Sequence, residues 1–279
     1  MHRSFFPLQL GVSPSSLTRR RHPDAASEEE FARMREKALR RDTYVCQGCG
    51  LLFEAYDGAP GGGLDVHHIN ANPRDNRIEN LVSLCPLCHG TQHLGFFSRR
   101  FGNMMQLIFC PEISQNCLNM LSWVSAIVFY RSQNLQSCNS VFRDKANLLT
   151  STLTKRQEFP KNYFASASVM KNFLDMQRDK NGPVASLATI LATIRQKEAW
   201  AYEVREKWLW GVRIFYNPLL YEQFLDRKNK NLVAHLATKQ EWQPGEDWEK
   251  SFICIARDVL ARVEKKQSMG ESKKKGGLS

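Results

Sequence analysis

Two cysteine pairs, Cys46-Gln47-Gly48-Cys49 and Cys85-Pro86-Leu87-Cys88, are separated by thirty-five residues in this chain of 279. A Cys-x-x-Cys turn brings two thiolates to one metal ion, and two such turns complete the tetrahedral set of four sulfurs that zinc prefers. A thioredoxin-type redox site needs one pair and not two. The spacing therefore predicts a structural Zn²⁺ held by Cys46, Cys49, Cys85 and Cys88.

Four of the seven histidines lie between residues 67 and 93. The alternation in Leu64-Asp65-Val66-His67 is typical of a strand, which would place His67 and His68 on opposite faces. His89 and His93 are four residues apart, so on a helix they share one face. His67, His89 and His93 are then candidates for a three-ligand metal site with open positions, which is the catalytic kind. His68 would be left to act as a base on a water molecule.

Around these histidines the chain resembles the HNH endonuclease motif in its zinc-knuckle form. The resemblance rests on Leu64-Asp65-Val66-His67-His68-Ile69, on Asn80-Leu81-Val82-Ser83-Leu84-Cys85-Pro86-Leu87-Cys88-His89 and on His93. It implies a ββα-metal unit, a hairpin followed by one helix, over residues 38–98. Two features depart from the motif. Asn72-Pro73-Arg74-Asp75-Asn76-Arg77 replaces a frequent Gly-Gly pair, and Gly90 weakens the expected helix.

The HNH resemblance also implies roles for single residues. His68 would be the general base that activates water for attack on a DNA phosphodiester, and Asn80 would fix the loop that orients His68. A divalent cation such as Mg²⁺, Mn²⁺ or Ni²⁺ would be held by His67 and His89, with His93 as a third ligand, and would stabilise the leaving oxygen. The structural alternatives are a satisfied surface histidine at position 93 and an asparagine at position 80 that only caps a turn.

The flanks of the cysteine block resemble the IcmJ/DotN proteins and their plasmid conjugation relatives. The similar segments are 8–12, 19–24, 107–115 and 118–121. This resemblance implies a component of a type IVB secretion or conjugation apparatus that docks on the coupling ATPase and other coupling-complex subunits. In that family the zinc unit is regarded as a binding scaffold. Two hypotheses follow, a DNA endonuclease within such an apparatus as the first and a non-catalytic adaptor as the alternative.

The composition is basic, with 39 Lys and Arg against 28 Asp and Glu, a net charge of +11 and a pI near 9.4. This balance favours a polyanionic partner such as DNA. The most apolar run, 118–130, is interrupted by polar residues and is shorter than the roughly 20 residues that cross a bilayer. No long apolar region follows the N-terminal charge. We therefore expect a cytoplasmic protein without a transmembrane segment, peripheral to the inner membrane where it docks on the coupling ATPase.

These patterns predict an α+β protein with four segments. They are an N-terminal arm and helix (1–37), the ββα-metal zinc domain (38–98), a strand plus buried helix (99–150) and an α-helical region with a disordered basic tail (151–279). The apolar run 104–110 predicts a strand, and Ser114 is expected to cap a helix that ends at Tyr130. The polar segment 131–163 is interpreted as a linker. The aromatic stretch 200–221 is interpreted as helical core in preference to a stacking surface for nucleic acid. Further helices are expected over 27–41, 219–236, 248–263 and from 183 onward.

Overall fold

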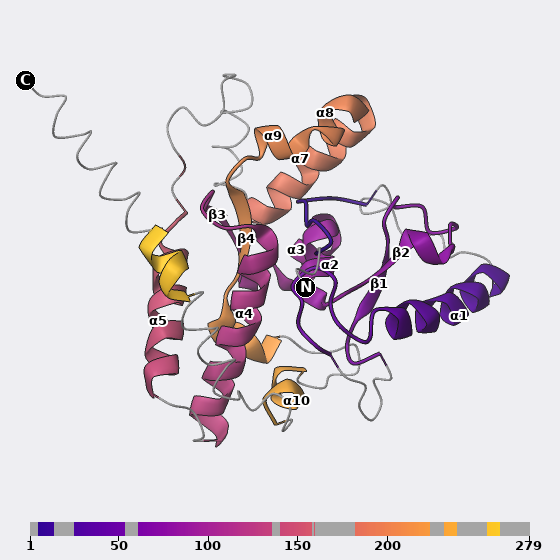
Figure 1. Ribbon diagram of the computed structural model, residues 1–279. Coiled ribbons are helices and arrows are strands. Elements are labelled where there is room, and N and C mark those ends of the chain that lie inside the picture. The colour runs from indigo at the N-terminus through magenta and orange to yellow at the C-terminus, as the bar shows by residue number, and fades with distance from the viewer. Residues whose placement is uncertain are drawn as a thin grey trace, which may run out of the picture.

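The computed structural model describes residues 5–13, 25–53, 61–135, 140–157, 159, 182–223, 232–238 and 256–262. Over these residues the protein is α+β, with helices around two separate two-stranded antiparallel sheets (Figure 1). This confirms the predicted fold class. The helices and strands in chain order are α1 (Ala25–Arg41), β1 (Asp65–His68), η1 (Ile78–Asn80), β2 (Leu81–Leu84), α2 (Pro86–Gln92), α3 (Leu94–Phe101), η2 (Gly102–Met104), β3 (Met105–Phe109), α4 (Gln115–Tyr130), η3 (Arg131–Leu135), α5 (Ser140–Thr154), α7 (Pro183–Lys197), α8 (Ala199–Glu203), α9 (Arg205–Trp208), β4 (Val212–Tyr216), η4 (Pro218–Gln223) and α10 (Leu232–Thr238), with a further helix over 256–262.

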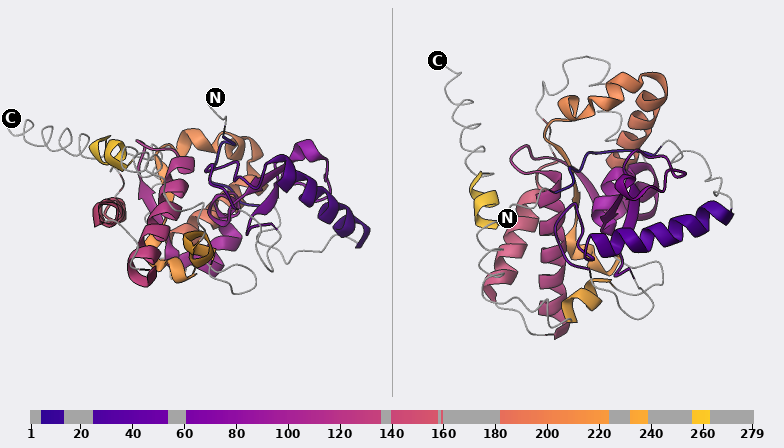
Figure 2. Two further views of the ribbon diagram at one scale, coloured as in Figure 1. Left: turned by 60° about the horizontal axis from the view of Figure 1, so that its bottom comes forward. Right: turned by 45° about the vertical axis from the view of Figure 1, so that its right-hand side comes forward.

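The hairpin and helix of a ββα unit are present. β1 and β2 pair antiparallel with His67 opposite Val82, and α2 follows β2 after a single residue. That residue is Cys85, the N-cap of α2, and Pro86 occupies the first turn, where its missing N–H has no helical partner. α1 lies along the hairpin (Figure 2) and buries Leu39 completely against it.

The strand and helix predicted after the ββα unit are also confirmed. β3 falls within the apolar run 104–110, and α4 ends at Tyr130 as expected. The Ser114 side chain accepts a hydrogen bond from the backbone N–H of Cys117 at 3.2 Å, which satisfies one of the free donors of the first turn of α4. α4 is buried along most of its length and packs against α5, α10, η4 and β4.

The described part of the C-terminal region is mostly helical, as predicted, but it contains a strand, β4, within the aromatic stretch 200–221 that was expected to be helical core. β4 pairs antiparallel with β3, with Met105 opposite Tyr216 and Phe109 opposite Val212. The stretch Val212-Arg213-Ile214-Phe215-Tyr216 is rich in the β-branched and aromatic residues that favour strands. No strand was predicted over 212–216, because the strand with which it pairs lies more than one hundred residues earlier in the sequence, between residues 105 and 109.

The linker predicted over 131–163 is wrong for the part that forms α5. Phe142, Ala146, Leu149 and Leu153 recur at helical spacing and are buried among more numerous polar residues. α5 packs beside α4 (Figures 1 and 2). Buried apolar residues from all of these elements form one continuous core.

The other C-terminal predictions have mixed outcomes. Parts of the helices predicted over 219–236 and 248–263 lie outside the described residues, and the described parts are η4, α10 and the helix over 256–262. Phe215 and Tyr216 are core residues as predicted, but Trp200 and Trp210 are 71% and 56% exposed. The basic tail lies outside the described residues. Within the described part of the chain, no helix is both long enough and apolar enough to cross a membrane. The four-segment division stays a prediction.

Candidate functional site

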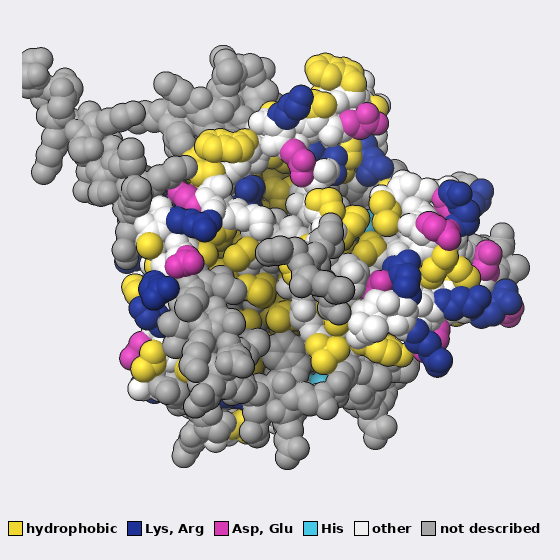
Figure 3. Space-filling view, in the orientation of Figure 1, with side chains coloured by type: hydrophobic (Ala, Val, Ile, Leu, Met, Phe, Trp, Pro, Cys, Tyr) yellow, Lys and Arg dark blue, Asp and Glu magenta, His cyan; other side chains and the backbone are white. Residues whose placement is uncertain are grey.

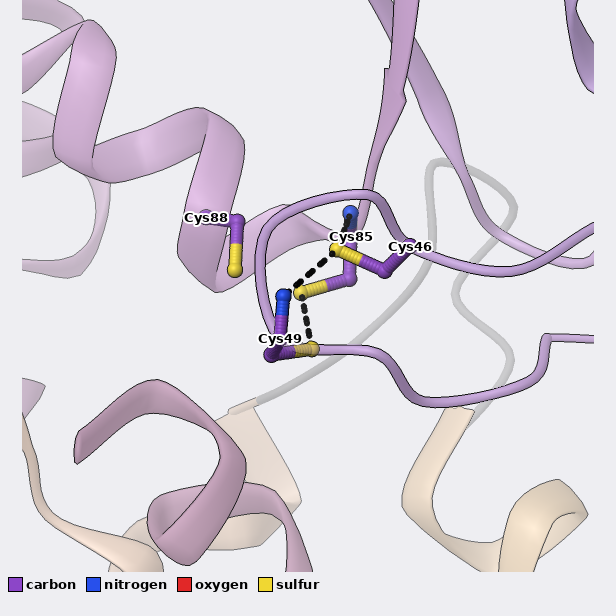
Figure 4. Close-up of side chains that lie close together, drawn as sticks. All are labelled: Cys46, Cys49, Cys85 and Cys88. Atoms are coloured by element: carbon purple, nitrogen blue, oxygen red, sulfur yellow. Dashed lines mark hydrogen bonds between the residues drawn. The ribbon is translucent and has the colours of Figure 1, made fainter. Parts of the chain in front are cut away.

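The four cysteines of the two pairs meet in one buried cluster (Figure 4). Their sulfur atoms all lie within 4.8 Å of one another, and all four side chains are buried. The backbone N–H of Cys85 donates to the sulfur of Cys46 at 3.1 Å. Gly48 leaves room for the cluster, because a Cβ atom there would lie 2.9 Å from the Cys88 sulfur.

The electrostatics of this cluster suit a cation. Burial raises the pKa of the Cys49 and Cys88 thiols well above the usual value. Burial also acts on Cys46, but hydrogen bonds from the other three cysteines outweigh it and lower the Cys46 pKa. Four buried thiolates without a counter-charge are unfavourable, and a divalent ion removes that penalty. The four-sulfur donor set therefore fits a bound metal of the zinc type.

α4 contributes two donors to these sulfurs that sequence reasoning missed. Trp123 Nε1 donates to Cys85 Sγ at 3.2 Å, and Asn119 Nδ2 donates to Cys88 Sγ at 3.4 Å. Gln115 Nε2 donates to Asn119 Oδ1 at 2.8 Å and so fixes the direction of that amide. Residues 115, 119 and 123 are four apart and so share one face of α4, whereas the sequence analysis considered Asn119 only as an interruption of an apolar run.

A second cluster contains the three histidines predicted as metal ligands. One ring nitrogen from each of His67, His89 and His93 lies within 4.8 Å of the others. His67 Nδ1 and His93 Nε2 are 3.0 Å apart, and the ring centroids of His89 and His93 are 4.5 Å apart. His93 is not inside a helix with His89 as expected, because α2 ends at Gln92 and α3 begins at Leu94.

Asp65 orients this cluster and was not singled out from the sequence. His89 Nδ1 lies 3.0 Å from Asp65 Oδ2, the geometry of a histidine N–H donating to a carboxylate. Such a bond fixes the tautomer and leaves Nε2 free for a metal. Asp65 precedes His67 by two residues on β1, so the strand period puts both side chains on one face.

Burial keeps the centre of the cluster uncharged. Burial, followed by the neighbouring His89 and His68, lowers the pKa of His67 from 6.5 to about 3. A neutral imidazole is the form that binds a metal ion. His67 therefore offers a neutral nitrogen ligand, within 4.8 Å of a ring nitrogen of each of the other two histidines.

The depressed His67 pKa predicts acid sensitivity. Between pH 6.5 and about 3 the unfolded chain binds a proton that the folded chain does not, so stability is complete above pH 6.5 and is lost as the pH falls. The full loss is roughly 5 kcal/mol at most. Urea unfolding of wild type and His67→Gln from pH 7 to pH 4, without added divalent metal, measures it. The free energy of unfolding of the variant should depend less steeply on pH than that of wild type. Equal pH dependences would contradict the depressed pKa of His67.

His68 faces the other side of β1, against α1. Its Nε2 atom lies 3.0 Å from Asn76 Oδ1, and its ring stacks on Phe31 with a centroid distance of 5.0 Å. Asn76 Nδ2 donates to Glu30 Oε2 at 3.2 Å, which turns the amide oxygen toward the histidine. His68 Nε2 therefore carries the hydrogen, and Nδ1 keeps the lone pair that can accept a proton.

Asn80 closes the loop that carries Asn76. It is 8% exposed, its Oδ1 accepts from the backbone N–H of Asn70 at 3.0 Å, and its Nδ2 donates to the Asp75 carbonyl at 2.8 Å. The side-chain hydrogen bond from Arg77 lowers the pKa of Asp75 and stabilises the same loop. Asn80 therefore acts on His68 indirectly, by holding the loop from which Asn76 bonds to the histidine. Sequence reasoning did not single out Asn76.

Two comparisons with known proteins agree with this geometry. Residues 51–85 match the family model described as HNH endonuclease, a match that includes β1, β2 and the first two of the candidate histidines, His67 and His68. The protein therefore contains an HNH domain. Over 120 residues the chain is 30% identical to the type 4 apparatus protein DotN of Legionella pneumophila. That match covers 42% of this chain and 50% of DotN, so the chain spans about half the length of this curated relative, to which it is similar.

Proposed function

We propose that this protein is a metal-dependent DNA endonuclease of the HNH type that acts as a component of a type IV secretion or conjugation apparatus. The observation that carries the proposal is that two adjacent histidines of β1 lie in two different environments. His67 joins His89 and His93 on one face, while His68 is held by Asn76 on the other. A ligand cluster next to a separately oriented base is what metal-assisted hydrolysis requires.

The residues divide the chemistry between them. His68 Nδ1 takes the proton of a water molecule as the water oxygen attacks phosphorus and the bond to the leaving oxygen breaks. Phe31 stacks on the His68 ring, and Asn76 keeps its Nε2 protonated, so the ring presents one basic nitrogen. A divalent cation, when bound to the three clustered histidines, supplies positive charge for the phosphate and the leaving oxygen. The four cysteines hold a structural Zn²⁺.

Charge supports a DNA substrate. The chain carries a net charge of +11. On the face in Figure 3, Lys and Arg side chains gather over α1, which is the helix that covers His68. The exposed basic residues of α1 are Arg33, Lys37, Arg40 and Arg41. The first turns of the same helix carry the exposed residues Glu28, Glu29 and Glu30, so the basic surface lies toward its C-terminal end. This surface and the net positive charge favour a polyanion.

Similarity to DotN supports the place of the protein in an apparatus. We infer a cytoplasmic location, peripheral to the inner membrane, with the coupling ATPase and other coupling-complex subunits as partners. The second candidate function is a non-catalytic adaptor that docks on that ATPase. The observation that favours it is the exposure of Trp200 and Trp210, because tryptophan is enriched at protein interfaces and among the residues that contribute most to binding.

A plasmid nicking assay tests the two candidates. Zinc-loaded wild type is incubated with supercoiled plasmid and Mg²⁺, Mn²⁺ or Ni²⁺, beside His89→Ala and the control His235→Ala, a histidine of α10 outside the cluster. Metal-dependent nicking by wild type and the control, lost in His89→Ala, supports the nuclease. If folded, zinc-loaded wild type does not nick with any of these metals, the adaptor is favoured, and a pull-down against the coupling ATPase follows.

A further inference from the structure

We propose that Tyr202 and Arg205 are positioning residues for His93, acting through the N-terminal strap, defined as residues 5–12. This inference rests on the proposed role of His93 as a metal ligand. It gives a function to α8 and α9, which contribute no residue to the cysteine or histidine cluster. The strap runs from the cysteine cluster past α3 to the C-terminal helices (Figure 2).

The strap breaks the helix that carries two of the three histidines. Gly11 N–H donates to the Thr91 carbonyl at 3.0 Å, and Leu94 N–H donates to the Gly11 carbonyl at 2.9 Å. In an uninterrupted helix those two groups would pair with residues 95 and 90. One residue of the strap therefore takes both bonds, and His93 lies at the break with φ −127° and ψ 47°.

The C-terminal helices hold the strap on either side of Gly11. Val12 N–H donates to the Tyr202 hydroxyl at 2.9 Å, and Arg205 Nε donates to the Leu10 carbonyl at 2.8 Å. The guanidinium groups of Arg195 and Arg205 lie 4.9 and 4.2 Å from the centroid of the Tyr202 ring. Leu10 and Val12 are 6% and 1% exposed, so the strap is buried where it is held.

Position matters here because the His67 and His93 nitrogens are already 3.0 Å apart. Functional ligand sets need their groups fixed within roughly 0.5 Å. His93 keeps its own backbone bonds, with its N–H donating to the Gly90 carbonyl at 3.1 Å and its carbonyl accepting from Phe96 and Phe97. The helical ladder is interrupted at Thr91 and Leu94, and there Gly11 supplies the bonds that set the position of the break. Loosening the strap is therefore expected to move His93 and leave His67 and His89 in place.

The affinity of the histidine cluster for Ni²⁺ measures this effect. Calorimetry on the zinc-loaded full chain compares wild type with the double variant Tyr202→Phe/Arg205→Met. The matched control is Trp200→Phe/Lys207→Met, which changes exposed residues of the same two helices. The double variant should bind Ni²⁺ about tenfold more weakly, the low end of what loss of an outer-shell partner costs. The control should bind as wild type does, and zinc content should stay the same in all three.

The possible results distinguish failure of this inference from failure of the proposed function. If wild type does not bind Ni²⁺ at the histidines, the metal site and the strap inference both fail. If wild type binds and the double variant binds equally well, only the strap inference is wrong. Should the double variant not fold, Gly11→Ala decides, because its Cβ would lie 3.1 Å from the Gln92 carbonyl oxygen, a contact tight enough that the strap or the end of α2 must shift at the break. Unchanged Ni²⁺ affinity in Gly11→Ala would then overturn the inference.

Discussion

Replacement of His68 by alanine is expected to slow metal-dependent plasmid nicking by about 10²–10⁴-fold, the usual contribution of a general base. Folding, zinc content and Ni²⁺ affinity should not change. The reason is geometric, since His68 contacts Asn76 and Phe31 and is not part of the three-histidine cluster. The change removes the proton acceptor together with its contacts to Asn76 and Phe31, none of which belongs to the metal cluster.

The assay needs a control close to the site. Ile69→Ala changes the next residue, whose side chain is 46% exposed, and should nick at the wild-type rate. Single-turnover rates at saturating metal separate loss of the base from weaker metal binding. Persistent nicking by His68→Ala, together with loss in His89→Ala, would show that another group removes the proton.

Loss of one cluster cysteine is expected to abolish cooperative folding. Cys88 is completely buried, and its sulfur accepts the hydrogen bond from Asn119 of α4. Structural Zn²⁺ binds with an apparent free energy of about 10–16 kcal/mol, which is comparable to the whole stability of a domain, about 5–15 kcal/mol. Cys88→Ser, or removal of the metal by a chelator, should therefore leave no cooperative urea transition.

The matched control for this variant is Cys117→Ser. Cys117 is half-buried, lies on the first turn of α4 and is outside the cluster. Zinc analysis, near-ultraviolet circular dichroism of the aromatic side chains and urea unfolding provide the measurements. A metal-free Cys88→Ser protein that unfolds cooperatively at the wild-type midpoint would refute the structural role of the metal.

Local patterns allowed part of the fold to be predicted. The cysteine spacing predicted the sulfur cluster because a Cys-x-x-Cys turn is a short-range device, and Ser114 predicted the start of α4 for the same reason. β4 was missed because its partner β3 is remote in sequence. α5 was missed because four apolar positions were outnumbered by polar residues on the exposed face.

The residues of the candidate site also include some that local sequence patterns indicate and others that only the packing of the fold brings together. The spacing between His89 and His93 predicted their proximity, although the helix breaks at the second of them. Asp65 could have been found from the strand period that it shares with His67. Asn76 and Glu30 could not, because their link to His68 depends on how α1 packs against the loop, and that packing has no signature in local sequence.

The long reach of the strap has a consequence for synthesis on the ribosome. Val12 bonds to Tyr202, which is made 190 residues later, whereas all four cysteines have emerged by residue 88. Domains form as their chain appears, and contacts between distant residues form last. The nascent chain can therefore capture zinc early, but the break at His93 is completed only after α8 is translated. The histidine cluster is therefore expected to reach its final geometry later in synthesis than the cysteine cluster.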